Sequence, residues 1–472
     1  MAEGGIQSAM SQTETVPGQR SLHSRHSQNH VERVSFEICT IMTRLGYSEE
    51  IRRWRVEKYK EQDRLVNARF SDKSFITAGS KAEGLTCFFE SDMDILYVME
   101  GVLCVEAGFN LHTIPGDIGV FRMDTRVYPG HCRLLQERRG HTHSNRIHNC
   151  LCDNGYGDIL LSSSLFLDEY SESSADSYKV FHEREGPSTP WTADGVLHVD
   201  RVLALRCQCP SILQRWAARP RHWPSPDTVQ KVVSFGAFVT PVGFKESETK
   251  HMEWRTCLNT GESELVNNLN GTQAQVYVML KTILKDVLRP CKKEVTSYVI
   301  KNILLWQAES NSQDEFDTRS FFHWLHAGLR ELKTAIATQQ LSYNMIPERN
   351  LMAGSDLQDQ QKSQWLTDIT NMMAEGPRVI LRLPKIRKAV VASPEPMLWF
   401  SKKRMELEML FVEFWNRRTY SLSEDLVPDE YDDIQHEISR RMRKLMVEVA
   451  QRMHVEGCAV YDLWAIQKRM LM

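Results

Sequence analysis

The sequence predicts a protein of the α+β class, in which a lobe built on a mixed β-sheet precedes an all-helical lobe. Short apolar runs separated by Gly, Pro and Asp dominate residues 75–244, a pattern typical of the strands of one sheet. From residue 253 onward, apolar residues recur at helical spacing. A further helical pattern precedes the sheet, over residues 34–70.

The composition of the 472-residue chain excludes several classes of protein. Hydrophobic residues make up 42% of the chain, so it can bury a sizeable core and global disorder is excluded. No run of about 18 uncharged apolar residues occurs, so no membrane-spanning helix is expected. Eleven scattered cysteines, without a visible secretory signal, indicate reduced thiols and a location in the cytosol or the nucleus. The 58 basic and 61 acidic residues nearly balance, so a nucleic-acid partner would need local basic patches.

Composition shifts divide the chain into predicted segments. These are a disordered tail (1–30), the sheet lobe (31–250), the helical lobe (251–355), a basic connector (356–396) and a helical extension of unknown role (397–472). The tail is rich in Ser, Gln, His and Gly. Prolines between Pro377 and Pro396 argue against a continuous helix in the connector. Gly46 and Ser48 interrupt the first helical pattern, so one kinked helix and two shorter helices both remain open.

Two acidic residues, Asp92 and Asp94, lie at the start of an apolar run. Side chains two residues apart on a strand project to the same face, so these carboxylates would form a pair. Hard divalent cations favour such oxygen pairs. Upstream, the turn Gly79-Ser80 offers a backbone amide and a hydroxyl to a triphosphate. Taken alone, an Asp-x-Asp pair is most often only a solvated strand end.

A third acid, Asp200, is embedded in the apolar run 199–205. Burying a carboxylate in an otherwise apolar strand is costly unless the group binds something. Two-metal nucleotidyl transfer normally needs a third carboxylate on a neighbouring strand, where it holds the metal that activates the attacking hydroxyl. The three acids therefore predict a two-metal transfer site. No phosphate-binding P-loop, dinucleotide-binding glycine motif, His-Glu-x-x-His or nucleophile elbow indicates a competing enzyme class.

This arrangement resembles the nucleotidyltransferase motif of cyclic GMP–AMP synthase-like receptors, which share their fold with the male-abnormal-twenty-one-like (Mab family) proteins. Gly79-Ser80, a gap of eleven residues, Asp92 and Asp94 carry the match. Within residues 35–352 the resemblance continues, in order, through 199–205, Trp223-Pro224, 239–243, 253–255, Glu262, Glu264-Leu265, Gln273, Ser297-Tyr298, Lys301, Tyr343, Ile346-Pro347 and Asn350-Leu351. It implies a bilobal nucleotidyltransferase fold: a mixed β-sheet with a spine helix, closed by a helical C-terminal lobe.

The resemblance also implies roles for individual residues. Asp92, Asp94 and Asp200 would hold two Mg²⁺ or Mn²⁺ ions and carry the catalysis. Nucleotide contacts are implied for Gly79 and Ser80 at the donor triphosphate, Lys281 at phosphate, Tyr298 stacked on a base beside Ser297, and Arg255 at the acceptor-side base. Structural alternatives stay open for two of them: Arg255 as an ion pair that joins the lobes, and Tyr298 as part of a helix core.

Two departures from the family pattern limit what carries over. The vertebrate DNA-sensing enzyme has a His-Cys-Cys-Cys zinc insertion, whereas residues 267–273 run straight into the next helix, so no structural zinc is expected. Cys257 stands where the family commonly has Ser, which places one nucleotide contact in doubt. Two other groups are interpreted as strand residues rather than zinc ligands: His141, His143, His148, Cys150 and Cys152, and Cys207 with Cys209.

The polar side of the first helical pattern is basic. Its cations are Arg52, Arg53, Arg55, Lys58 and Lys60. In the resembled receptors this spine helix lines the surface that binds double-stranded nucleic acid, which implies a double-stranded partner, RNA rather than DNA. Two further sets would extend such a surface: Arg215, Arg219, Arg221 and His222, and in the connector Lys385, Arg387 and Lys388. Binding through them would depend strongly on salt. The alternative is a basic helix face that is only solvated.

The resemblance thus predicts a nucleic-acid-activated enzyme of innate immunity, which joins two nucleotides of the ATP/GTP type into a cyclic dinucleotide second messenger. One alternative is a catalytically inactive Mab-family developmental or scaffold protein that at most binds a nucleotide. Another is a template-free RNA-tailing transferase, which would release linear products. The three retained acids favour an enzyme over the scaffold. The sequence does not indicate the activating ligand, the bases, the linkage or the oligomeric state.

Overall fold

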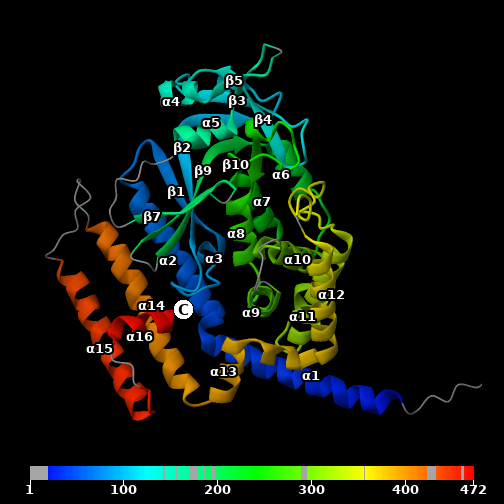
Figure 1. Ribbon diagram of the computed structural model, residues 1–472, viewed down its shortest axis with the longest axis vertical. Helices are drawn as coiled ribbons and strands as arrows, with labels where there is room; N and C mark the ends of the chain where they lie inside the picture. Colours follow the sequence, from blue (N-terminus) through cyan, green and yellow to red (C-terminus); the bar gives the residue numbers. More distant parts are fainter. Residues whose placement is uncertain are drawn as a thin grey trace, which may run out of the picture.

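The computed structural model describes residues 20–141, 144–155, 157–170, 179–184, 186–193, 197–288, 295–355, 357–421, 432–458 and 462–471. One mixed sheet of eleven strands forms its centre, and helices surround that sheet (Figure 1). The strands run in the order β1-β2-β3-β4-β11-β10-β9-β8-β7, with β5 and β6 joined to β4, and β2 also pairs with β9. The predicted α+β class, a mixed sheet with a helical C-terminal region, is confirmed.

The strands have the following bounds: β1 Lys73–Ala78, β2 Met93–Val105, β3 Gly119–Asp124, β4 His131–Arg138, β5 Leu151–Asp153, β6 Ile159–Leu161, β7 Lys179–Phe181, β8 Ser188–Ala193, β9 Leu197–Gln208, β10 Ala237–Thr240 and β11 Glu253–Cys257. Short helices connect them: α3 Gly79–Ala82, α4 Ser144–Asn149, α5 Ser163–Glu169, α6 Pro210–Ala217 and α7 Pro226–Ser234. The predicted strand-rich region therefore carries a few short helices between its strands.

The first helical pattern forms a kinked helix. α1 (Arg20–Met42) continues through a π-helical turn, η1 (Thr43–Tyr47), into α2 (Glu49–Asn67). Gly46 supplies the kink because it adopts a φ of 86°, which is favourable only for glycine. The Ser48 hydroxyl then accepts a hydrogen bond from the Ile51 amide and caps α2. Since α1 begins at Arg20, the tail predicted over residues 1–30 is wrong for its last part, and residues 1–19 lie outside the described residues.

Both lobes share one hydrophobic core. Side chains of the sheet, such as Trp254 and Leu205, belong to the same buried cluster as Tyr277 and Trp365 of the helical lobe. That lobe consists of α8 Asn259–Asn267, α9 Gly271–Ile283, α10 Ser297–Ser310, α11 Phe321–Thr338 and α12 Asp359–Glu375. A shared core fixes the position of one lobe against the other, as the bilobal fold requires.

The stretch predicted as a basic connector is largely helical. α12 occupies residues 359–375, and α13 (Pro384–Ala392) follows a 3-10 segment, η6 (Gly376–Arg382). Prolines do fall at the boundaries, as Pro377 and Pro384 do in the first turns of η6 and α13, where a missing amide hydrogen costs nothing. The prolines therefore divide this stretch into short helices instead of removing them.

The extension consists of α14 Met397–Tyr420, α15 Asp433–Val455 and α16 Leu463–Leu471. α14 packs against α2, so that α2 lies between the helical lobe and the extension (Figure 1). A second buried cluster joins Leu407, Phe411 and Leu445 of the extension to Cys87 and Phe88 of the sheet lobe. The extension is thus packed onto the core of the protein. Within the described ranges, no helix is long and apolar enough to cross a membrane.

The second cluster yields a stability prediction. Leu445 is fully buried, whereas Val447 on the same helix is 39% exposed. Leu445→Ala should lower the free energy of unfolding by about 2–4 kcal/mol, because it leaves a cavity in the packed interface. Val447→Ala should change it by less than about 0.5 kcal/mol. Urea unfolding of the full chain measures both values, and equal small effects would show that the extension is not packed as described.

Candidate functional site

The sheet brings two of the predicted acids face to face. β2 and β9 are parallel neighbours, and their register pairs Asp94 with Asp200. Both side chains are half-buried, and the Ser188 hydroxyl on β8 donates a hydrogen bond of 3.1 Å to Asp200 Oδ1. Asp92 lies immediately before β2 and is exposed. The third carboxylate therefore stands on the strand next to the Asp-x-Asp strand, directly opposite Asp94.

Gly79 lies against the Asp94 carboxylate. The antiparallel pairing of β1 with β2 sets Ala78 opposite Asp94, and the chain turns at Gly79 with a φ of +62°. A Cβ atom at this position would lie 2.0 Å from Asp94 Oδ2, a distance at which the two atoms cannot coexist. Only glycine lets the turn approach the acid this closely. Sequence reasoning assigned Gly79 to the triphosphate and did not reveal this second constraint.

A lysine of the helical lobe reaches the same turn. Lys281 Nζ, on α9, donates a hydrogen bond to the Ser80 hydroxyl. Burial lowers the pKa of Lys281, although acids nearby, Glu83 first among them, oppose the shift. The structure therefore brings together Ser80 and Lys281, 201 residues apart in the sequence, next to the paired acids.

The acid pair is electrostatically strained. Burial raises the pKa of Asp94 to about 7, and the negative charges of Asp200 and Asp92 add to that rise. Lys301 and Lys281 act in the opposite direction. A divalent cation would relieve the repulsion, and carboxylate oxygens are the ligands that Mg²⁺ and Mn²⁺ prefer. The donor set thus fits such an ion, although among the described residues no group of three or more His, Cys, Asp and Glu side chains is gathered as a complete metal site.

A buried ionic network links the two lobes beneath these residues. Lys301 Nζ on α10 lies 2.6 Å from Glu83 Oε1 and 3.4 Å from Glu262 Oε2. The Tyr298 and Tyr343 hydroxyls both donate to Glu262 Oε1, at 2.5 and 2.6 Å. Lys301, Glu262 and Tyr343 entered the sequence analysis only as family matches without a role, and Glu83 was missed, because nothing local in the sequence marks them as partners.

The remaining predicted nucleotide contacts lie on two elements. Ser297 begins α10, and Tyr298 follows it with a half-buried ring whose hydroxyl is held by Glu262. Arg255 lies on β11, half-buried, opposite His131 of β4. The Arg255 guanidinium forms no ion pair within the part of the chain that the structure describes. The alternative interpretation of Arg255 as an ion pair between the lobes therefore finds no support.

The basic surface predicted on the spine helix is wrong for most of its residues. Arg52 is 3% exposed and donates to the backbone oxygens of Val266 and Leu269, in the helical lobe. Arg55 is 1% exposed and pairs with Glu408 of α14. Lys58 forms ion pairs with Glu61 and Glu413. These cations hold neighbouring helices in place, so of the five predicted cations only Arg53 and Lys60 are exposed, and Arg53 pairs with Glu49.

The two further basic sets are also partly used inside the protein. Arg219 pairs with Glu309, Arg221 lies over the Trp216 ring with its guanidinium carbon 4.3 Å from the ring centroid, and Lys385 pairs with Glu90. Arg215, Arg387 and Lys388 are exposed.

The interpretation of the His and Cys groups as strand residues holds for Cys152 on β5 and Cys207 on β9, but it is wrong for His148, which lies on α4. Cys150, Cys207 and Cys209 are buried, and His143 lies outside the described residues. The ten cysteines of the described part are free. Between α8 and α9 the chain passes through a short turn, in which Asn270 and Gln273 cap α9 reciprocally.

The paired acids on a mixed sheet, closed by a helical lobe, define a protein of the nucleotidyltransferase fold. Two family models agree: the Mab-21 protein nucleotidyltransferase domain matches residues 131–268, and the Mab-21 protein HhH/H2TH-like domain matches residues 272–371. Together they cover about half of the chain. The chain belongs to the Mab-21 family, as the resemblance predicted. A comparison with curated proteins gives no match.

The matched ranges do not include the whole candidate site. Asp200 and Arg255 lie within the first range, and Lys281 with Tyr298 within the second. The turn Gly79-Ser80 and the acids Asp92 and Asp94 precede both ranges, and α13 to α16 follow them.

The strain on Asp94 predicts an unusual dependence of stability on pH. Because the folded pKa is about 7 against the usual 3.8, ionising Asp94 costs stability, and the cost grows as the pH rises from 3.8 to 7. At about 1.4 kcal/mol per pH unit, metal-free Asp94→Asn should be more stable than the parent chain by roughly 2–4 kcal/mol at high pH. The gain should nearly vanish in mild acid. Thermal unfolding in chelator near pH 8 and pH 4.5 measures it, and a loss of stability at the higher pH would contradict the strain.

Proposed function

We propose that this protein is a nucleotidyltransferase that joins two ribonucleoside triphosphates of the ATP/GTP type into a cyclic dinucleotide. The observation that carries the proposal is the pairing of Asp94 with Asp200 across parallel strands, beside the Gly79 turn. Lys281, which reaches Ser80 of the same turn, adds a cation where phosphates would lie. The family membership supports the choice of nucleotidyl transfer over other metal chemistry.

Different residues would bind the metal ions, the triphosphate and the bases. Asp92, Asp94 and Asp200 would hold two Mg²⁺ or Mn²⁺ ions, which when bound would offset phosphate charge and activate the attacking hydroxyl. The Gly79 amide and the Ser80 hydroxyl would contact the donor triphosphate, and Lys281 would offset part of its charge. Base contacts would come from two places: the Tyr298 ring beside Ser297, and Arg255 on β11.

The chemistry would proceed in two transfers. In the first, a ribose hydroxyl oxygen of the acceptor attacks the α-phosphorus of the donor, and Asp200 helps to orient that hydroxyl. A new phosphorus–oxygen bond forms, the bond to pyrophosphate breaks, and the hydroxyl proton passes to solvent. In the second, the remaining triphosphate undergoes the same attack within the linear product. This attack closes the ring and releases a second pyrophosphate.

The biological setting is part of the same proposal. A role in innate immune signalling with double-stranded RNA as activator rests on the family resemblance, and a location in the cytosol or the nucleus rests on the cysteine content. Of the cations that the sequence analysis assigned to RNA binding, Arg53 and Lys60 on α2 are exposed, as are Arg215, Arg387 and Lys388 elsewhere. Such a scattered set supports weaker binding than the basic surface expected from the sequence, and a shallower dependence on salt, because fewer phosphates are neutralised.

One observation favours a second candidate function, a non-catalytic Mab-family scaffold that at most binds a nucleotide. The described residues contain no complete group of three metal-ligating side chains, and Asp92 lies exposed at the strand start. Product analysis separates the two functions.

Incubation of the purified 472-residue chain with all four ribonucleoside triphosphates and Mg²⁺ or Mn²⁺ tests the proposal. Double-stranded RNA, double-stranded DNA or no nucleic acid is added, and Asp200→Asn serves as the control. We expect a phosphatase-resistant cyclic product that is lost in Asp200→Asn, because removing one metal-holding carboxylate disables the transfer. Linear products would indicate a tailing transferase. No turnover under any condition would favour the scaffold.

The close approach of Gly79 to Asp94 makes a second prediction. Gly79→Ala should lower product formation by about 100-fold or more, because the added methyl group must displace the Asp94 carboxylate by an ångström or more. Gly271→Ala is the matched control, since a Cβ atom there meets nothing within 4 Å. Initial rates at saturating nucleotide measure both variants. Equal rates for the two would remove Asp94 from the proposed chemistry.

A further inference from the structure

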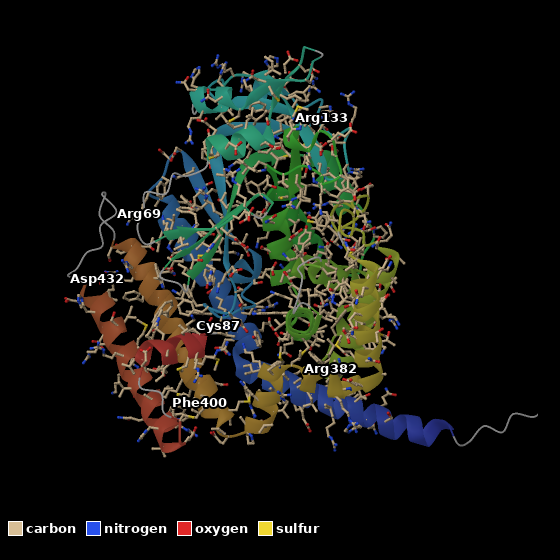
Figure 2. All side chains as sticks on the ribbon, viewed as in Figure 1. Arg69, Cys87, Arg133, Arg382, Phe400 and Asp432 are labelled. Carbon is tan, nitrogen blue, oxygen red and sulfur yellow. The ribbon has the colours of Figure 1, made fainter. Side chains whose placement is uncertain are left out.

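Residues 83–92 connect the Gly79-Ser80 turn to Asp92, and their position decides where both ends of the candidate site lie. Lys81 of α3 donates to the backbone oxygens of Cys87 and Phe88, and the C-terminal helices supply further packing. Cys87 and Phe88 are buried in the cluster formed with α14, α15 and α16, and Figure 2 shows Cys87 between the sheet lobe and these helices. The Phe88 ring lies 4.7 Å from the Phe411 ring of α14, centroid to centroid. The Phe89 amide donates a 2.9 Å hydrogen bond to the backbone oxygen of Leu471, at the end of α16.

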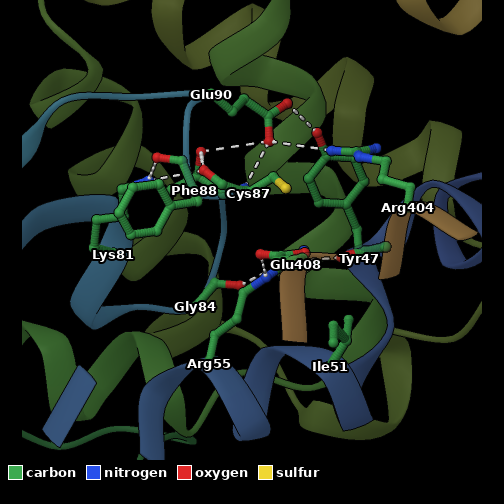
Figure 3. Close-up of polar contacts among 12 residues, drawn as sticks. Tyr47, Ile51, Arg55, Lys81, Gly84, Cys87, Phe88, Glu90, Arg404 and Glu408 are labelled. Carbon is green, nitrogen blue, oxygen red and sulfur yellow. Dashed lines mark hydrogen bonds and ion pairs between the residues drawn. The ribbon is translucent and has the colours of Figure 1, made fainter. Parts of the chain in front are cut away.

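The charged end of the loop is held by the C-terminal helices as well. Glu90 accepts a hydrogen bond from Lys385 of α13. It also accepts one from the Tyr47 hydroxyl, and Arg404 of α14 lies 3.9 Å away (Figure 3). Burial alone would raise the pKa of Glu90, but Lys385 and Arg404 hold it well below its usual range. The same carboxylate accepts from the Cys87 amide at 2.9 Å, so the ionised group also fixes the loop backbone.

The beginning of the loop is tied to α14 through α2. Arg55 forms a two-point pair with Glu408, with both nitrogen–oxygen distances at 2.7 Å. The other terminal nitrogen of Arg55 donates to the backbone oxygens of Gly46 and Gly84, at 2.8 and 3.2 Å (Figure 3). Gly84 itself has a φ of +65° and no room for a Cβ atom, because Arg52 O would lie 2.3 Å away. Glu408 thus orients the guanidinium that holds the first residues of the loop.

A buried ion pair adds little net stability to the contact between two helices. The cost of taking both charges out of water offsets much of their attraction, and apolar residues of the same size would often stabilise the interface equally well. What a two-point pair supplies is direction, since the planar guanidinium fixes the position of every group that accepts from it. The contact between Glu408 and Arg55 therefore specifies where Gly84 lies.

From these contacts we infer that α13 to α16 position the active-site loop 83–92, with Glu408 and Glu90 as positioning residues for Asp92 and the Gly79-Ser80 turn. The inference rests on the proposed function for its meaning, and it assigns to the C-terminal extension a direct role in the site. Neither family match covers these helices.

The test compares Glu408→Gln and Glu90→Gln with Glu413→Gln in the 472-residue chain. Glu413 is the matched control because it also lies on α14 and pairs with α2, through Lys58, but it is 38% exposed and touches no part of the loop. Hydrogen–deuterium exchange of residues 83–92 is the first readout, and it requires no activity. Both positioning variants should exchange at least about tenfold faster there, since they lose ionised acceptors, whereas the control should match the parent chain.

Mn²⁺ binding, measured by titration calorimetry, is the second readout, with Asp94→Asn marking the signal that belongs to the site. Glu408→Gln and Glu90→Gln should weaken this binding by about tenfold, and Glu413→Gln should not.

Unchanged exchange in the loop, or faster exchange with unchanged Mn²⁺ affinity, would overturn the inference. If the parent chain binds no Mn²⁺ through Asp94, the proposed function fails instead, and loop exchange still decides whether the helices position the loop.

Discussion

The parallel register of β2 and β9 forces two carboxylates, Asp94 and Asp200, to lie side by side in a half-buried position. Burial, and then the negative charges of Asp200 and Asp92, make the ionised form of Asp94 unfavourable and raise its pKa. The surrounding residues reduce this electrostatic cost. Two lysines from the helical lobe, Lys281 and Lys301, bring positive charge toward the pair, and Gly79 removes the one side chain that would otherwise collide with it.

The same arrangement explains why the lobes must be held rigidly. Lys301 lies between Glu83 of the sheet lobe and Glu262 of the helical lobe, so any change in lobe position would leave a buried charge without its partner. Arg52 ties α2 to the helical lobe, while Arg55 ties it to α14. The buried cations of α2 thus hold neighbouring parts of the protein together, and few of its predicted cations remain to bind nucleic acid.

How far the sequence predicts the structure depends on the range of each interaction. Alternation and helical periodicity are local, so the fold class and the strands that carry Asp94 and Asp200 could be predicted. The buried ion pair of Arg55 could not be predicted, because its partner Glu408 is 353 residues away and both residues look like ordinary surface charges on helices. The connector was misjudged for a different reason: proline forbids a helix interior but suits a helix start, and the sequence alone does not tell these positions apart.

The central claim is that the Asp94–Asp200 pair exists to hold divalent metal beside a triphosphate. The most direct measurement is a crystal structure of the 472-residue chain with Mn²⁺ and a non-hydrolysable nucleoside triphosphate, using the anomalous signal of manganese. We expect a manganese peak between the Asp94 and Asp200 carboxylates, with the triphosphate against the Gly79-Ser80 turn and Lys281. Nucleotide bound elsewhere, or bound at the turn with no manganese at these carboxylates, would contradict it.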